Sequence, residues 1–146
     1  MKAAVLGAGT MGTGIAQLLL QAGFQVALVD PHASALERAR SRLADVLARL
    51  REKGRLGEDP EALLARLSAS TELGAAAGAA WVIEAAPEDL ALKRDLFARA
   101  AAAAPGAWLA TNTSTLSVTA IAAACPEPER VLGLHFFNPP ALMRLV

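Results

Sequence analysis

The chain has 146 residues, 54% of them hydrophobic, and its 14 basic and 14 acidic side chains give a formal net charge of zero. That length suits one domain with a substantial core, and the balanced charge argues against nucleic acid or a membrane surface as the main partner. No apolar run reaches the roughly 18 residues that a membrane span needs. Cys125 is the only cysteine, which excludes internal disulfides and cysteine-based metal clusters, and we expect no metal site.

The chain opens with an apolar strand, expected over residues 2–7, that runs into a glycine-rich turn and then a helix. This turn contains Gly7, Gly9, Thr10, Met11 and Gly12. In a Gly-x-Gly-x-x-Gly pattern the first glycine allows a tight turn, the second lets backbone N–H groups approach a pyrophosphate, and the third lets the helix lie close to the sheet. The start of the helix also favours an anion. The segment predicts a dinucleotide site. A strand that starts at residue 2 leaves no room for a leader peptide, so we expect a cytoplasmic location.

A second strand, expected over residues 25–30, ends on Asp30, about 20 residues beyond the glycines, as the dinucleotide fingerprint requires. A carboxylate there accepts a hydrogen bond from a ribose 2′-hydroxyl and repels a 2′-phosphate, which favours NAD over NADP. We interpret His32 as a turn residue and Arg38 as a surface charge of the next helix.

The crossover between the second and third strands is unusually long. Ser34 and Glu37 form a capping-box pattern that predicts a helix ending at Gly54, and an N-cap aspartate followed by proline at 59–60 predicts a second, short helix. We expect a helical hairpin here. Its tip carries Arg51, Lys53 and Arg55, which fit either a solvated surface or a landing site for a phosphorylated substrate tail.

Further strands are expected over residues 67–71, 80–85, 107–111 and 130–135. A helix is expected over 89–103 with Leu92, Leu96 and Ala100 facing inward, and Trp81 and Trp108 are interpreted as core or helix-packing residues. Strands that alternate with helices indicate an α/β fold. We predict a Rossmann-like, doubly wound parallel sheet with a helical-hairpin insertion between the second and third strands, all in one domain over residues 1–146.

Polar side chains follow the carboxyl ends of the later strands, where ligands bind in an open parallel sheet. They include Glu88, Asn112, Ser114, His135 and Asn138. The chain has no tyrosine, so a tyrosine acid is excluded. A histidine, with an unperturbed pKa of about 6.5, is well matched to accept a hydroxyl proton. A buried structural histidine remains the alternative for His135, and turn formation or helix capping remains the alternative for Ser114.

Three motifs together resemble a known family. They are Gly7-Ala8-Gly9-Thr10-Met11-Gly12-Thr13-Gly14-Ile15-Ala16, then Thr111-Asn112-Thr113-Ser114, then Gly133-Leu134-His135-Phe136-Phe137-Asn138-Pro139 with Met143-Arg144-Leu145-Val146. In order and spacing they resemble the NAD-binding domain of L-3-hydroxyacyl-CoA dehydrogenases, enzymes that transfer a hydride between a 3-hydroxyacyl-CoA and NAD to give a 3-oxoacyl-CoA.

The resemblance implies roles for individual residues. His135 would be the general base, Ser114 would hydrogen-bond the substrate oxygen, and Asn138 would orient the nicotinamide end. Glu88 and Lys93 match positions that contact the cofactor, and Asn112 lies in the same site. The resemblance also implies that the helical hairpin lies toward the CoA part of the substrate. This favours the interpretation that Arg51, Lys53 and Arg55 bind phosphate groups of CoA.

One departure concerns the end of the chain. In the family a glutamate that pairs with the histidine comes next after the position of Val146, and a helical second domain then supplies substrate walls and the homodimer contact. We expect these 146 residues to bind NAD with little or no turnover, within fatty-acid or related acyl-CoA metabolism such as β-oxidation. The alternatives are another β-hydroxyacid dehydrogenase, which would use a catalytic lysine, and a non-catalytic NAD-binding or structural relative.

Overall fold

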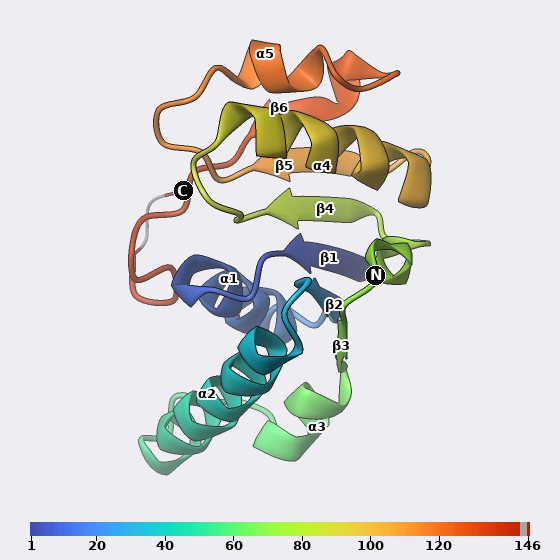
Figure 1. Cartoon of the computed structure of the whole chain (residues 1–146). Helices are drawn as coiled ribbons and strands as arrows, with labels where there is room; N and C mark the ends of the chain where they lie inside the picture. Colours follow the sequence, from blue (N-terminus) through green and yellow to red (C-terminus); the bar gives the residue numbers. More distant parts are fainter. Residues whose placement is uncertain (144–145) are drawn as a thin grey trace.

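Six parallel strands form one sheet in the order β3-β2-β1-β4-β5-β6 (Figure 1). The structure, a computed structural model, describes residues 1–143 and Val146. The strands are β1 (Lys2–Leu6), β2 (Gln25–Val29), β3 (Leu67–Ser70), β4 (Trp81–Glu84), β5 (Trp108–Thr111) and β6 (Val131–Gly133). This order is that of the doubly wound dinucleotide-binding fold, so the predicted fold class and all six strands are confirmed.

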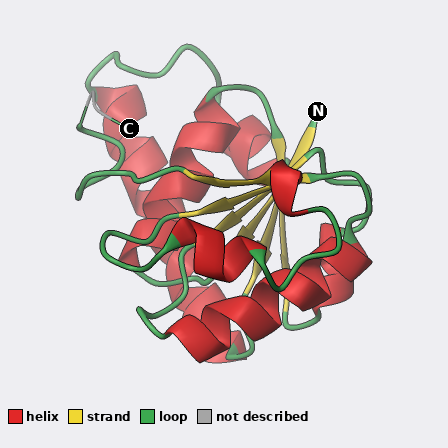
Figure 2. Cartoon of the chain, turned by 90° about the horizontal axis from the view of Figure 1, so that it is seen from above, coloured by secondary structure: helices red, strands yellow, loops and turns green. Residues whose placement is uncertain are grey.

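Helices cover both faces of the sheet, which Figure 2 shows nearly edge-on. One face packs against α1 (Thr10–Gln21), α2 (Ala33–Glu52) and α3 (Pro60–Ala65). The other packs against α4 (Leu90–Ala103), α5 (Val118–Ala122) and the 3-10 helix η1 (Leu73–Ala76), and a second 3-10 helix, η2 (Pro128–Arg130), precedes β6. Neighbouring strand residues point to opposite faces, so Val5 belongs to the first core and Leu6 to the second.

Two helices lie between β2 and β3, as expected, but the first does not begin as predicted. The N-cap of α2 is His32, and Ser34 makes no capping hydrogen bond because it already lies in the first turn. The Asp30 carboxylate accepts a hydrogen bond from the backbone N–H of His32 at 2.9 Å, and this bond holds the residue at which the helix starts. The start of α3 does follow the prediction, since the Asp59 side chain accepts from the backbone N–H of Glu61.

The inward face of α4 follows the prediction in part. Ala100 is buried and Leu96 packs half-buried against the second core, as expected, but Leu92 is 42% exposed. Lys93 and Phe97 are buried instead, and Lys93 forms an ion pair with Glu84 of the sheet.

Neither Trp81 nor Trp108 belongs to a buried core. Trp81 is half-buried and Trp108 is 43% exposed, and the two indoles stack on each other with ring centroids 6.1 Å apart at the amino ends of β4 and β5.

Because all the strands are parallel, their carboxyl ends share one edge of the sheet, on the left in Figure 1. The polar residues singled out above follow these ends, so the topology places them at one edge. Within the described part of the chain, no helix combines the length and apolar character that crossing a bilayer requires.

Candidate functional site

The glycine turn between β1 and α1 is shaped for close approach of backbone to a ligand. Gly7 has a φ of +104°, and a Cβ there would lie 2.8 Å from the Ala85 carbonyl oxygen. A Cβ at Gly12 would lie 1.8 Å from the carbonyl oxygen of Gly7, so this position has no room for a side chain. Gly9 has nothing within 4 Å of a Cβ position, so the space in front of it is open. This is the arrangement that a pyrophosphate against the start of α1 needs.

Asp30 connects the end of β2 to the glycine turn. Its carboxylate accepts from the backbone N–H of Ala8 at 2.9 Å and from the backbone N–H and ring Nδ1 of His32 at 2.9 and 3.2 Å. Burial alone would raise the pKa of Asp30, but the hydrogen bonds from Ala8 and His32 outweigh it and hold the pKa below its ordinary value. The side chain is 13% exposed, so an ionised acceptor faces the site beside the glycines.

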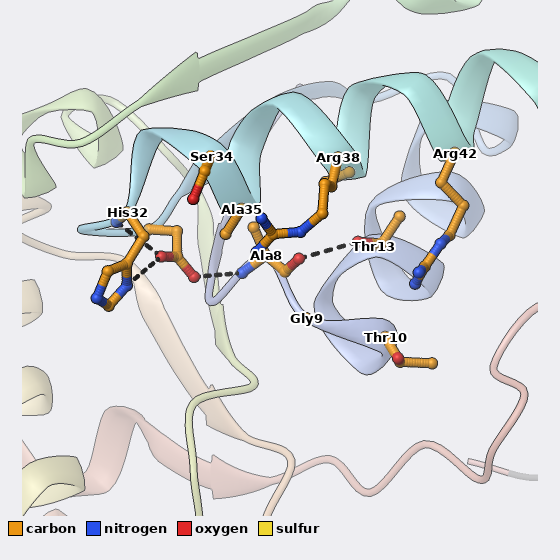
Figure 3. A pocket seen from close by; sticks show the side chains of 11 residues that line it. Ala8, Gly9, Thr10, Thr13, His32, Ser34, Ala35, Arg38 and Arg42 are labelled. Atoms are coloured by element: carbon orange, nitrogen blue, oxygen red, sulfur yellow. Dashed lines mark hydrogen bonds and ion pairs between the residues drawn. The ribbon is translucent and has the colours of Figure 1, made fainter.

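A cavity of about 430 Å³ opens between the glycine turn, the end of β2 and α2 (Figure 3). It is lined by Ala8, Gly9, Thr10, Thr13, Asp30, His32, Ser34, Ala35, Arg38, Ala39 and Arg42. Arg38 is exposed, as predicted for a surface charge, and it also lines this cavity together with the exposed Arg42. The signal was present in their spacing, because residues four apart share one helix face, but nothing in the sequence told which face α2 turns toward α1.

His135 lies just beyond β6 and is held by Asn112, which follows β5. Its Nδ1 is 3.3 Å from the carbonyl oxygen of Asn112, whose side-chain oxygen accepts from the backbone N–H of Phe136 at 2.8 Å. A carbonyl oxygen only accepts, so Nδ1 carries the proton in this bond, and the neutral ring keeps a lone pair on Nε2. The half-buried imidazole thus has one nitrogen fixed and the other available as a base.

Glu88 organises the loop after β5. Its carboxylate accepts from the Thr113 hydroxyl at 2.7 Å and from the backbone N–H of Ser114 at 3.2 Å. The Thr113 hydroxyl accepts in turn from the backbone N–H of Leu116 at 3.0 Å, so Thr113 is used inside the loop. Ser114 lies exposed next to it.

Lys93 lies beneath this edge of the sheet. Its Nζ is 2.6 Å from Oε1 of Glu84 and 3.1 Å from the carbonyl oxygen of Ala86, and the two charged side chains are 1% and 0% exposed. Glu84 also accepts from the Thr111 hydroxyl at 2.7 Å. The ammonium therefore supports the turn after β4 from within, a role for which sequence reasoning had no signal.

Residues 2–146 match the family model described as 3-hydroxyacyl-CoA dehydrogenase, NAD binding domain. The chain belongs to this family. The residues at the glycine turn and Asp30 fit the cofactor that the domain's description names, because Gly9 leaves open the space that a diphosphate needs and a carboxylate stands where a ribose hydroxyl is read.

Relatives of this 3-hydroxyacyl-CoA dehydrogenase domain match it along almost its whole length. A 3-hydroxyadipyl-CoA dehydrogenase from Escherichia coli is 49% identical, over 98% of this chain and 30% of the relative. A probable 3-hydroxybutyryl-CoA dehydrogenase from Deinococcus radiodurans is 41% identical, over 100% of this chain and 53% of the relative. The chain thus spans between about a third and about half of the length of these relatives.

Solved structures agree with the family assignment. The crystal structure of a 3-hydroxybutyryl-CoA dehydrogenase from Escherichia coli superposes with a TM-score of 0.94 at 46% identity, over 98% of this chain and 31% of that one. An (S)-3-hydroxybutyryl-CoA dehydrogenase from Ralstonia eutropha gives 0.92 at 36% identity, over 97% and 51%.

The other residues expected from the resemblance to 3-hydroxyacyl-CoA dehydrogenases lie outside the cavity beside the glycine turn. Asn138 is exposed in the segment that follows His135. The tip of the helical pair, with Arg51, Lys53 and Arg55, is exposed and lies beyond the cavity residues along α2. Of the last motif, residues 144–145 lie outside the described part of the chain.

Proposed function

We propose that the protein to which this domain belongs oxidises a 3-hydroxyacyl-CoA to the 3-oxoacyl-CoA with NAD, or catalyses the reverse reduction. The observation that carries the proposal is the fixed imidazole of His135 at the carboxyl edge of an NAD-binding sheet. NAD, when bound, supplies the acceptor for the hydride that leaves C3 of the substrate. The names of the relatives, which specify 3-hydroxybutyryl-CoA and 3-hydroxyadipyl-CoA, support an acyl-CoA as substrate.

In this proposal His135 takes the hydroxyl proton on Nε2 while Asn112 holds Nδ1. The carbonyl of Asn112 also stabilises the imidazolium that forms, since both ring nitrogens donate in that state. Ser114 hydrogen-bonds the substrate oxygen and Asn138 orients the nicotinamide end. Around them, Asp30 binds the adenosine ribose, while Glu88 and Asn112 shape the nicotinamide half through the loops that they hold. Lys93 contributes to the cofactor site by holding the turn after β4.

We further propose that a helical domain outside these 146 residues supplies walls of the acyl site and the contact of a homodimer, because the relatives are about twice as long or longer. The tip residues Arg51, Lys53 and Arg55 would meet the phosphates of CoA, so charge reversal there should raise KM for CoA thioesters. Unchanged kinetics would indicate that these three residues only form a solvated surface. A cytoplasmic place in fatty-acid or related acyl-CoA metabolism such as β-oxidation, with no nucleic-acid partner, completes the proposal.

The test is His135→Ala in the longest natural form of the protein, assayed by NADH formation from 3-hydroxybutyryl-CoA. Losing the base should reduce kcat by about 10²- to 10⁴-fold, which is the usual contribution of a general base, and should leave NADH affinity within about twofold. Wild-type protein without turnover would contradict the enzymatic proposal, and a fully active variant would remove His135 from the chemistry.

A further inference from the structure

Two arginines of α2 face the cofactor cavity, and we propose that they bind the diphosphate of NAD. Arg38 and Arg42 lie four residues apart and line the same cavity as Gly9 and Thr10 of the glycine turn. Figure 3 shows the Arg42 side chain extending from α2 toward the first turns of α1, and the Arg38 side chain running along α2 toward Ala35 and toward Ala8 of the glycine turn. The inference rests on the cofactor that the family assigns, and adds two residues that the glycine fingerprint does not contain.

Within the described part of the chain, neither guanidinium has a protein counter-ion. Among residues 1–143 and Val146, the ion pairs involve other arginines, lysines and histidines, and no carboxylate lies within salt-bridge distance of Arg38 or Arg42. Asp30, the acid of the same cavity, is bound instead by Ala8 and His32. Two like charges four residues apart on a helix repel each other, and an anion between them relieves that repulsion.

The opposite wall of the cavity is also electropositive. The N-cap of α1 is Gly9, which has no side chain to cap the helix, and the first turn contains no acidic residue. The Thr13 N–H donates to the carbonyl of Gly9, so the N–H groups of residues 10–12 precede the first helical bond. Helix dipole and guanidinium groups thus face one space from two sides, which suits a group with two negative charges.

The carboxylate of Asp30 argues that this cavity binds the diphosphate of NAD and does not bind the 2′-phosphate of NADP. Its pKa is lowered by the Ala8 and His32 hydrogen bonds against the effect of burial, so the group is ionised at neutral pH and repels a phosphate placed on it. CoA also carries an adenosine diphosphate. Because the arginines share their cavity with both Gly9 and Asp30, the geometry assigns the diphosphate to NAD, and the experiment includes CoA to separate the two sources.

The experiment compares the wild-type chain with Arg38→Gln, Arg42→Gln and the double variant. The control is Arg40→Gln, which removes the same charge from the same helix at an exposed position outside the cavity. Isothermal titration calorimetry measures Kd for NADH, ADP-ribose, adenosine, NADPH and CoA at low salt and at about 0.15 M salt. Thermal unfolding of each variant verifies that the fold is intact.

The double variant should raise Kd for NADH and ADP-ribose about tenfold at low salt, and less at about 0.15 M, because partly solvated charges are screened. Adenosine should bind unchanged, and Arg40→Gln should stay within about twofold of wild type. Equal losses for adenosine and ADP-ribose, losses confined to CoA or NADPH, or no loss at all would overturn the inference. Wild-type protein that binds no NADH would overturn the cofactor assignment together with it.

Discussion

The ion pair between Lys93 and Glu84 is costly to bury, because both charged side chains are almost completely removed from water. Glu84 is nevertheless fully satisfied, with bonds from Lys93, Thr111 and the backbone N–H of Ala86. A buried pair of this kind adds little net stability relative to apolar residues of the same size. Its value lies in fixing one geometry for the turn that packs under Gly7, through the backbone of residues 85–86.

Lys93→Met should lower the free energy of unfolding by about 3–5 kcal/mol, because it leaves an uncompensated carboxylate in the core. Urea denaturation measures the loss. Arg94→Met, at the exposed neighbouring position of α4, is the control and should change stability by about 0.5 kcal/mol at most. Adding Glu84→Gln should recover part of the loss, and equal stability of the Lys93 and Arg94 variants would contradict this account of the pair.

Asp30 makes part of the stability depend on pH. Its folded-state pKa lies below the ordinary value, so the stabilisation is complete above the unfolded-state pKa of about 3.9 and is lost as the pH falls through the folded-state pKa. Wild type should therefore be more stable than Asp30→Asn at pH 7, and the gap should close in acid. Unfolding curves measured from about pH 2 to about pH 7 test this, with the exposed Asp45→Asn as control. Parallel curves for wild type and Asp30→Asn would refute it.

At the scale of elements, the segment after β6 is held against α1. A Cβ at Gly14 would lie 2.9 to 3.3 Å from three carbons of the Pro140 ring, so only glycine lets this segment pack so closely on the helix. The segment continues from His135 and includes Asn138. The contact between Gly14 and Pro140 therefore helps to position two residues that are proposed for the nicotinamide half of the site.

Gly14→Ala should strengthen α1 intrinsically by about 0.8–1 kcal/mol yet displace the segment that Pro140 anchors. We therefore expect changed NMR chemical shifts at His135 and Asn138 with little change in adenosine binding. Gly57→Ala is the matched control, because nothing lies within 4 Å of its Cβ position. Identical shifts around His135 in wild type and Gly14→Ala would show that the contact does not position it.

The sequence was sufficient for features that local pattern decides. The six strands, Asp59 as N-cap and the glycine turn all follow from apolar runs and short-range backbone chemistry. It was insufficient where a distant contact decides. Lys93 rather than Leu92 faces inward because Glu84 lies on another element, and the orientation of Arg38 depends on how α2 packs against α1.

At the scale of the whole molecule, the two helical layers form separate cores on the two faces of the sheet, and the strand ends are left to form the site. In the proposed site the first half of the chain contributes the glycine turn, Asp30 and the two arginines, and the second half contributes the loops around Glu88 and His135. The proposed function requires that NAD bridge these two halves along one edge of the sheet.

A crystal structure of the chain with NAD bound tests that claim most directly. We expect the diphosphate to lie against the backbone of Gly9 and Thr10 and the adenosine ribose to lie on Asp30. We further expect the nicotinamide ring at the same edge of the sheet as the imidazole of His135. A nicotinamide ring placed at the opposite edge, away from His135, would contradict it.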